Sequence, residues 1–72
     1  MKQNVFSGKN RNEIESLIDL WVVGINHAER NRQVMKRRYI DGITYEKLGE
    51  EFSLTDWQVK NIVYECTKLI KI

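Results

Sequence analysis

The chain has few of the residues that usually hold a small domain together. It has 72 residues, with one cysteine, one histidine and no proline. One cysteine excludes a disulfide within the chain, and Cys66 and His27 alone are too few soft ligands for a zinc site. A single domain of this length buries too little surface for a generous stability margin. We therefore expect helix packing to stabilise it, with self-association or a bound partner adding to that.

Long apolar runs are also missing from the sequence. No stretch of about 18 apolar residues is present, which excludes a transmembrane helix and a membrane partner. The N-terminal sequence MKQNVFSGKN lacks the apolar core of a signal peptide. These features predict a reduced, cytoplasmic protein. We find no acid–base pair, nucleophile–base set, metal cluster or phosphate-binding loop, so the sequence indicates neither an enzyme nor a cofactor.

The absence of proline, together with abundant Glu, Lys, Arg, Ile, Leu and Val, favours an all-α chain. We expect a flexible N-terminus over residues 1–10, followed by one domain over residues 11–72. That domain is predicted to be a small helical bundle of three to four helices. Its first helix is predicted by apolar residues at helical spacing. These are Ile14, Leu17, Ile18, Trp21, Val22 and Ile25.

The later part of the chain predicts three further helical segments. The second helix covers about residues 29–40, and Asp41-Gly42 ends it. In the stretch ITYEKLGEEFSLTDWQVK, Thr44 is suited to cap a short third helix. Thr55 is suited to cap a fourth, with Gln58 at capping-box spacing. Two helices joined by so short a turn predict a C-terminal helix-turn-helix at about residues 44–66.

The fourth helix is predicted to run from Asp56 nearly to Lys71. One of its faces is apolar and is expected to lie in the core. This face consists of Val59, Ile62, Val63, Cys66, Leu69 and Ile70. The opposite side of its first turns is polar and aromatic. In a helix-turn-helix such side chains reach base edges in the DNA major groove. The candidate base contacts are Asp56, Trp57, Gln58, Lys60 and Asn61.

Positive charge is concentrated in one short segment. The net charge of the chain is +2, yet residues 29–43 contain five bases and two acids. Such a block suits phosphate contacts beside a helix-turn-helix, although a charge run is often only a solvated helix face. The candidate backbone contacts are Arg30, Arg32, Lys36, Arg37, Arg38, Thr44, Thr55 and Tyr64. Trp57 is either exposed or tucked against the third helix, and Tyr64 either contacts the DNA backbone or lies between helices.

From Arg32 to Lys71 the chain resembles region 4 of bacterial sigma factors. The resemblance rests on the order and spacing of small motifs across a little over half of the chain. The matching positions are Tyr39, Gly42, Tyr45, Glu46, Leu48, Gly49, Phe52, Leu54, Thr55, Val59, Lys60, Asn61 and Ile62. The resemblance implies that Lys60 and Asn61 face bases, with Asp56 and Trp57 beside them. The family often has arginine where Asp56 stands and glutamate where Trp57 stands, which argues against a standard promoter element as the preferred sequence.

The chain lacks the domains with which a sigma factor opens a promoter. It is therefore more similar to small stand-alone regulators of phages and prophages, such as the ArpU and RinA late-gene regulators. The resemblance implies a sequence-specific, double-stranded DNA-binding transcriptional regulator. Apolar residues of the first and last helices either form an ordinary core or provide the interface of a homodimer. One alternative is a module that docks on RNA polymerase or another regulator through Glu46, Glu50 and Glu51. Another is the DNA-recognition part of a phage packaging protein.

Overall fold

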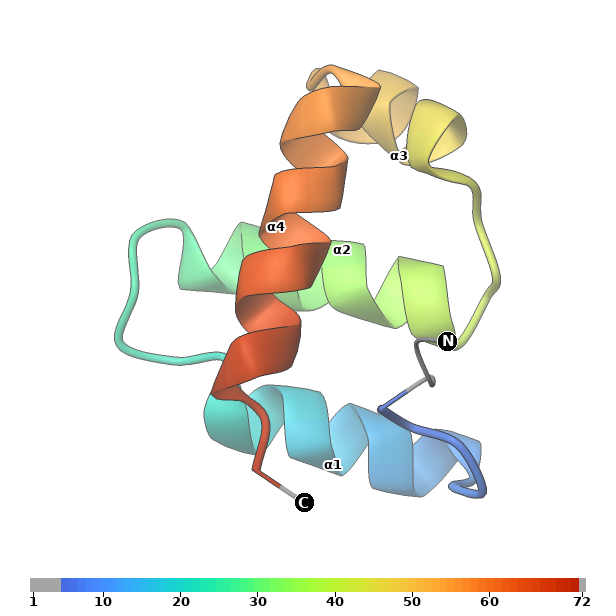
Figure 1. Cartoon of the computed structure of the whole chain (residues 1–72), viewed down its shortest axis with the longest axis vertical. Coiled ribbons are helices and arrows are strands. Elements are labelled where there is room, and N and C mark those ends of the chain that lie inside the picture. The colour runs from blue at the N-terminus through green and yellow to red at the C-terminus, as the bar shows by residue number, and fades with distance from the viewer. Residues whose placement is uncertain (1–4, 72) are drawn as a thin grey trace.

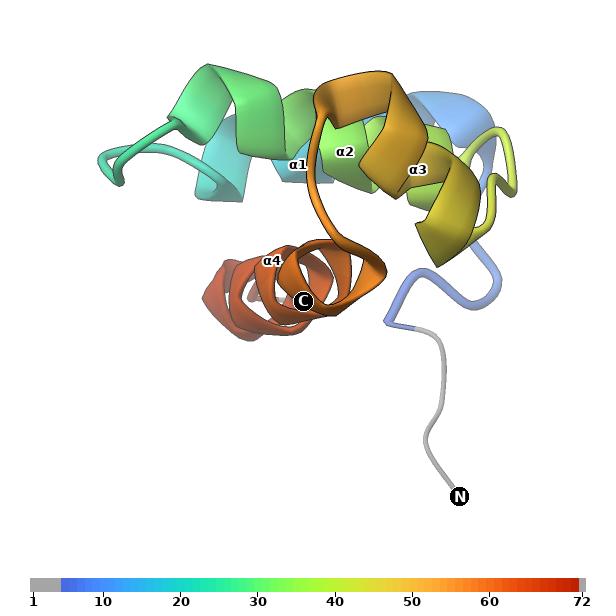
Figure 2. The same cartoon turned by 90° about the horizontal axis from the view of Figure 1, so that it is seen from above.

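Four helices make up the computed structural model, which describes residues 5–71; these residues contain no strand (Figure 1). They are α1 (Arg11–Trp21), α2 (Ala28–Tyr39), α3 (Tyr45–Phe52) and α4 (Asp56–Leu69). In Figure 1, α1 and α2 run in opposite directions and α4 crosses in front of them. Figure 2 shows α4 on one side of the molecule and the other three helices on the opposite side. The predicted all-α bundle is confirmed.

Polar side chains fix where three of the helices begin. Asn10 caps α1 and forms a capping box with Glu13. The predicted capping box of α4 is present, because the Thr55 hydroxyl accepts from the amide of Gln58 and the Gln58 side chain accepts from the amide of Thr55. Thr44 caps α3 as predicted. Each of these contacts spans three residues, which explains why the local sequence is enough to place the helix starts.

The end of α1 differs from the prediction. The apolar stripe was expected to continue to Ile25, but the helix ends at Trp21 and Ile25 is exposed. Gly24 takes a left-handed conformation with φ of 71°, which interrupts the helical path. The side chain of Arg32 donates from Nη1 to the carbonyl oxygen of Val22 at 2.8 Å. An arginine of α2 therefore satisfies a carbonyl that a longer α1 would have bonded internally.

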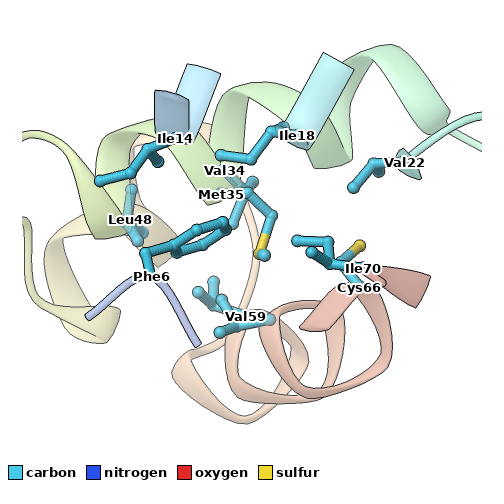
Figure 3. Close-up of a cluster of buried hydrophobic side chains, with 11 residues drawn as sticks. Phe6, Ile14, Ile18, Val22, Val34, Met35, Leu48, Val59, Cys66 and Ile70 are labelled. Atoms are coloured by element: carbon cyan, nitrogen blue, oxygen red, sulfur yellow. The ribbon is translucent and has the colours of Figure 1, made fainter. Parts of the chain in front are cut away.

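The core is a single cluster to which all four helices contribute (Figure 3). Cys66 is buried in it, as its place on the apolar face of α4 predicted. Burial raises the pKa of the Cys66 thiol to about 11. The buried apolar side chains are Phe6, Ile14, Ile18, Val22, Val34, Met35, Leu48, Val59, Val63, Cys66 and Ile70.

Phe6 corrects the sequence-based expectation of a flexible segment over residues 1–10. Its side chain is 3% exposed and belongs to the core. The ring meets Tyr39 of α2 edge to face, with 4.8 Å between the ring centres. Residues 1–4 lie outside the described residues. A lone aromatic in a polar segment shows no helical periodicity, so no local pattern indicates that Phe6 packs against distant helices.

The corner between α3 and α4 depends on a buried glycine. Ser53 ends α3 in a left-handed conformation with φ of 59°, and the amide of Leu54 donates to the carbonyl of Gly49 at 2.7 Å. A Cβ atom on Gly49 would lie 2.5 Å from the carbonyl oxygen of Leu54. Such a contact is too short, so glycine allows the turn to fold back closely onto α3. The two helices are thereby joined by three residues, 53–55, and pack against each other.

An ion-pair network connects α2 to α3. The guanidinium of Arg37 donates to both carboxylate oxygens of Glu51, at 2.8 and 2.7 Å, and to Asp41 at 2.9 Å. Two parallel bonds to one carboxylate fix geometry better than a single contact does. The hydrogen bonds from Arg37 lower the pKa of Glu51 below its ordinary value of 4.5.

This lowered pKa predicts how acid destabilises the fold. Because the folded state favours ionised Glu51, its stabilising contribution is complete above pH 4.5 and is lost as the pH falls through the depressed folded-state pKa. We expect the variant Glu51→Gln to be less stable than wild type at pH 7 and to lose less stability on acidification. Urea unfolding across this pH range measures the difference. Glu50→Gln, at the exposed neighbouring position, is the control, and equal pH slopes for wild type and Glu51→Gln would contradict the prediction.

Candidate nucleic-acid interface

The outer face of α4 carries an exposed stripe of aromatic and polar side chains. Trp57 is 67% exposed and Tyr64 is 52% exposed, and Lys60, Asn61 and Lys68 are also exposed. Residues separated by three, four or seven positions share one side of a helix. The stripe therefore lies opposite the buried face of α4. The exposure of Trp57 and Tyr64 answers the question the sequence left open, because neither side chain is enclosed between helices.

A groove of about 740 Å³ lies beside this stripe. Its walls come from the end of α2, the start of α3 and the outer face of α4. Arg38, Lys60 and Lys68 supply positive charge to these walls, and no acidic residue is among the described residues that line them. A groove with one sign of charge attracts a polyanion more strongly than scattered charges do.

Aromatic rings hold these positive charges in place. The guanidinium carbon of Arg38 lies 4.3 Å from the centre of the Tyr45 ring, and the amine of Lys60 lies 5.9 Å from it. Arg38 also donates to the carbonyl of Ile43 at 3.0 Å. The amine of Lys68 lies 4.4 Å from the centre of the Tyr64 ring. Cation–π contacts of this kind orient long basic side chains that would otherwise sample many rotamers.

Two residues of this surface, Tyr45 and Lys68, were not among the predicted contacts. Lys68 follows Tyr64 by four positions, so its helical spacing was a usable signal. Tyr45 had no such signal, because its meeting with Arg38 and Lys60 depends on how three helices pack.

The five predicted base contacts fall into two groups, according to whether the side chain bonds the backbone at the start of α4. Asp56 accepts from the amide of Trp57 at 2.9 Å, and the side-chain oxygen of Gln58 accepts from the amide of Thr55 at 2.9 Å. These two side chains therefore cap the helix itself. The side chains of Trp57, Lys60 and Asn61 project from the exposed face without a capping bond.

The predicted phosphate contacts also separate in the structure. Of the five bases in the block, Arg38 lines the groove, whereas Lys36 pairs with Asp19 at 2.8 Å and Arg37 pairs with Glu51 and Asp41. Arg32 binds the Val22 carbonyl, and Arg30 donates to Asn31 Oδ1 at 3.2 and 3.1 Å. Lys36 and Arg37 lie around a different depression, which Asp41 and Glu15 also line. The exposed Thr44 and Thr55 use their hydroxyls as helix caps.

Comparison of the chain with models of known protein families, with curated proteins and with solved structures finds no match. The resemblance to sigma factor region 4 thus stays a prediction from the residues that carry it. Within residues 5–71, no helix has the length and apolar character needed to cross a membrane. The same residues contain no group of three or more His, Cys, Asp or Glu side chains placed to hold a metal ion.

Proposed function

We propose that the protein is a sequence-specific, double-stranded DNA-binding transcriptional regulator whose α4 enters the major groove. The observation that carries this proposal is the division of α4 into two faces. Its buried face fixes the helix to the core, while Trp57, Lys60 and Asn61 project from its first two turns. In a helix-turn-helix these turns are the ones that reach base edges. Asn61 suits adenine and Lys60 suits guanine or a phosphate.

The groove beside α4 supplies the proposed phosphate contacts. Arg38 and Lys68 both line this groove, and each lies against an aromatic ring. The Tyr64 ring, 4.4 Å from the Lys68 amine, lies on the same face of α4. By contrast, Arg32, Lys36 and Arg37 do not line this groove and bind groups elsewhere in the chain, so we assign them to the stability of the fold. Phosphate contacts made in this way set the register of α4 without reading sequence.

The second candidate function is docking on RNA polymerase or another regulator. It is favoured by the charge of α3, where Glu46 and Glu50 are exposed. These carboxylates repel DNA phosphates and suit a basic protein surface. Glu51, the third acid predicted for this role, is bound to Arg37. We rank this function second because the groove beside α4 carries positive charge.

Selection of binding sites from a random duplex pool, followed by titration of the enriched sequence, tests the proposal. We expect one motif to bind at least about a thousandfold more tightly than random DNA at near-physiological salt. Two copies of the motif at fixed spacing would show that the protein binds as a dimer. An unenriched pool, with binding that disappears as salt rises, would contradict the proposal and favour protein docking.

Two substitutions separate base contacts from phosphate contacts. We expect Asn61→Ala to lower the preference for the enriched base at one position by about 1–3 kcal/mol. We expect Lys68→Ala to weaken all sequences alike and to reduce the salt slope by about one. Arg11→Ala, which removes an exposed charge from α1, is the control for net charge and should change neither quantity. If Asn61→Ala leaves sequence preference unchanged, the assignment of the reading face is wrong.

A further inference from the structure

Trp57 is the largest side chain exposed on the proposed reading face. Its indole is 67% exposed, at the second residue of α4. The backbone of this turn is held in place, because Asp56 accepts from the Trp57 amide and the Thr55–Gln58 capping box closes around it. An apolar double ring is thus presented to solvent from a fixed position. Lys60 and Asn61 follow Trp57 by three and four residues, so a ligand that contacts these polar side chains would also cover the ring.

The major groove offers an indole few apolar partners. The base edges there present hydrogen-bond donors and acceptors, except for the 5-methyl group of thymine. Indole has one donor, Nε1–H, and no acceptor, so most of its surface gains only from apolar contact. Asn61 lies four residues further along the same face of α4, a rise of about 6 Å. Its amide is suited to pair with N6 and N7 of adenine.

We infer that Trp57 is a specificity-determining residue that packs on the 5-methyl group of a thymine in the bound DNA. The rise between Trp57 and Asn61 spans one or two base-pair steps of about 3.4 Å. The binding site therefore has a thymine under Trp57 and an adenine under Asn61 within neighbouring base pairs. This inference rests on the proposed function, because it requires that the outer face of α4 lies in the major groove.

Replacing each thymine of the selected duplex in turn with deoxyuridine removes a single methyl group and tests the contact. We expect one replacement to weaken wild-type binding about fourfold, as the loss of one buried methyl group predicts. The same deoxyuridine replacement in the DNA should not change the affinity of the Trp57→Ala variant. Trp57→Phe, which keeps an apolar ring, should retain part of the preference for thymine over deoxyuridine. Leu20→Ala, which removes an exposed apolar side chain from α1 outside the groove, should retain all of it.

The experiment distinguishes failure of the thymine contact from failure of the proposed function. Sequence-specific binding with no effect of deoxyuridine at any position would overturn the thymine contact alone. Full discrimination by Trp57→Ala would do the same, because another residue would then read the methyl group. Absence of any selected duplex would overturn the proposed function and the thymine contact together. Because Trp57 is exposed, its removal should leave the circular dichroism spectrum and the unfolding midpoint unchanged, which excludes misfolding as the cause of an altered affinity.

Discussion

Replacing Phe6 with alanine is expected to lower the free energy of unfolding by about 3 kcal/mol. The ring is 3% exposed, lies against Tyr39 and extends into the cluster that contains Met35 and Leu48 (Figure 3). Removing it leaves a cavity that the surrounding side chains fill only in part. For a domain of this length the expected total stability is about 4–11 kcal/mol. One residue of the N-terminal segment thus contributes a large share of it.

Urea unfolding of wild type and Phe6→Ala measures this loss. Phe6→Leu, which keeps most of the apolar volume, should lose clearly less stability than Phe6→Ala. Ser7→Ala changes the exposed neighbour and should stay within about 0.5 kcal/mol of wild type. If Phe6→Ala behaves like Ser7→Ala, the N-terminal segment does not pack on the core in solution.

Replacing Gly49 with valine is expected to cost about 3 kcal/mol or more, because it forces the corner between α3 and α4 to open. The first added carbon already lies 2.5 Å from the carbonyl oxygen of Leu54, and valine adds two further methyl groups at this buried position. The atom in the way belongs to the backbone, so no side-chain rotation relieves the contact. Any movement of this turn also displaces the start of α4. We therefore expect specific DNA binding to fall together with stability.

Glu50→Val provides the matched control for Gly49→Val. It places the same β-branched side chain one position later in α3, where the native residue is exposed. Helix propensity changes by well under 1 kcal/mol in either substitution, so a large difference between them reports the steric contact. Gly49→Ala should lie between wild type and Gly49→Val. Equal unfolding midpoints for Gly49→Val and Glu50→Val would show that the corner has more space than the structure gives it.

Much of the fold follows from short-range features of the sequence. Thr44 and Thr55 mark the starts of α3 and α4 because each hydroxyl bonds an amide only three residues away. The spacing of Val59, Val63 and Cys66 identifies the buried face of α4, and the exposed face follows as its complement. The positions of Trp57, Lys60 and Asn61 on this exposed face were therefore accessible to sequence reasoning.

The sequence does not show which of the basic side chains form ion pairs within the chain and which remain available to a ligand. Five bases in one segment are indistinguishable by sequence, yet Arg37 binds Glu51, fourteen positions away, and Lys36 binds Asp19, seventeen positions away. Arg38, next to Arg37, instead faces the groove beside α4. Adjacent residues on a helix point about 100° apart, so neighbours meet different helices. Which of them is available to a phosphate depends on what each helix packs against.

Local sequence patterns specify that this chain forms helices, where α3 and α4 begin and which face of α4 is buried. These properties depend on contacts within about one helical turn, so they are encoded locally. The packing of the helices against each other places Phe6 in the core and leaves Arg38 of α2 lining the groove beside α4. Both outcomes require segments far apart in the chain to meet, and no local pattern specifies such a meeting.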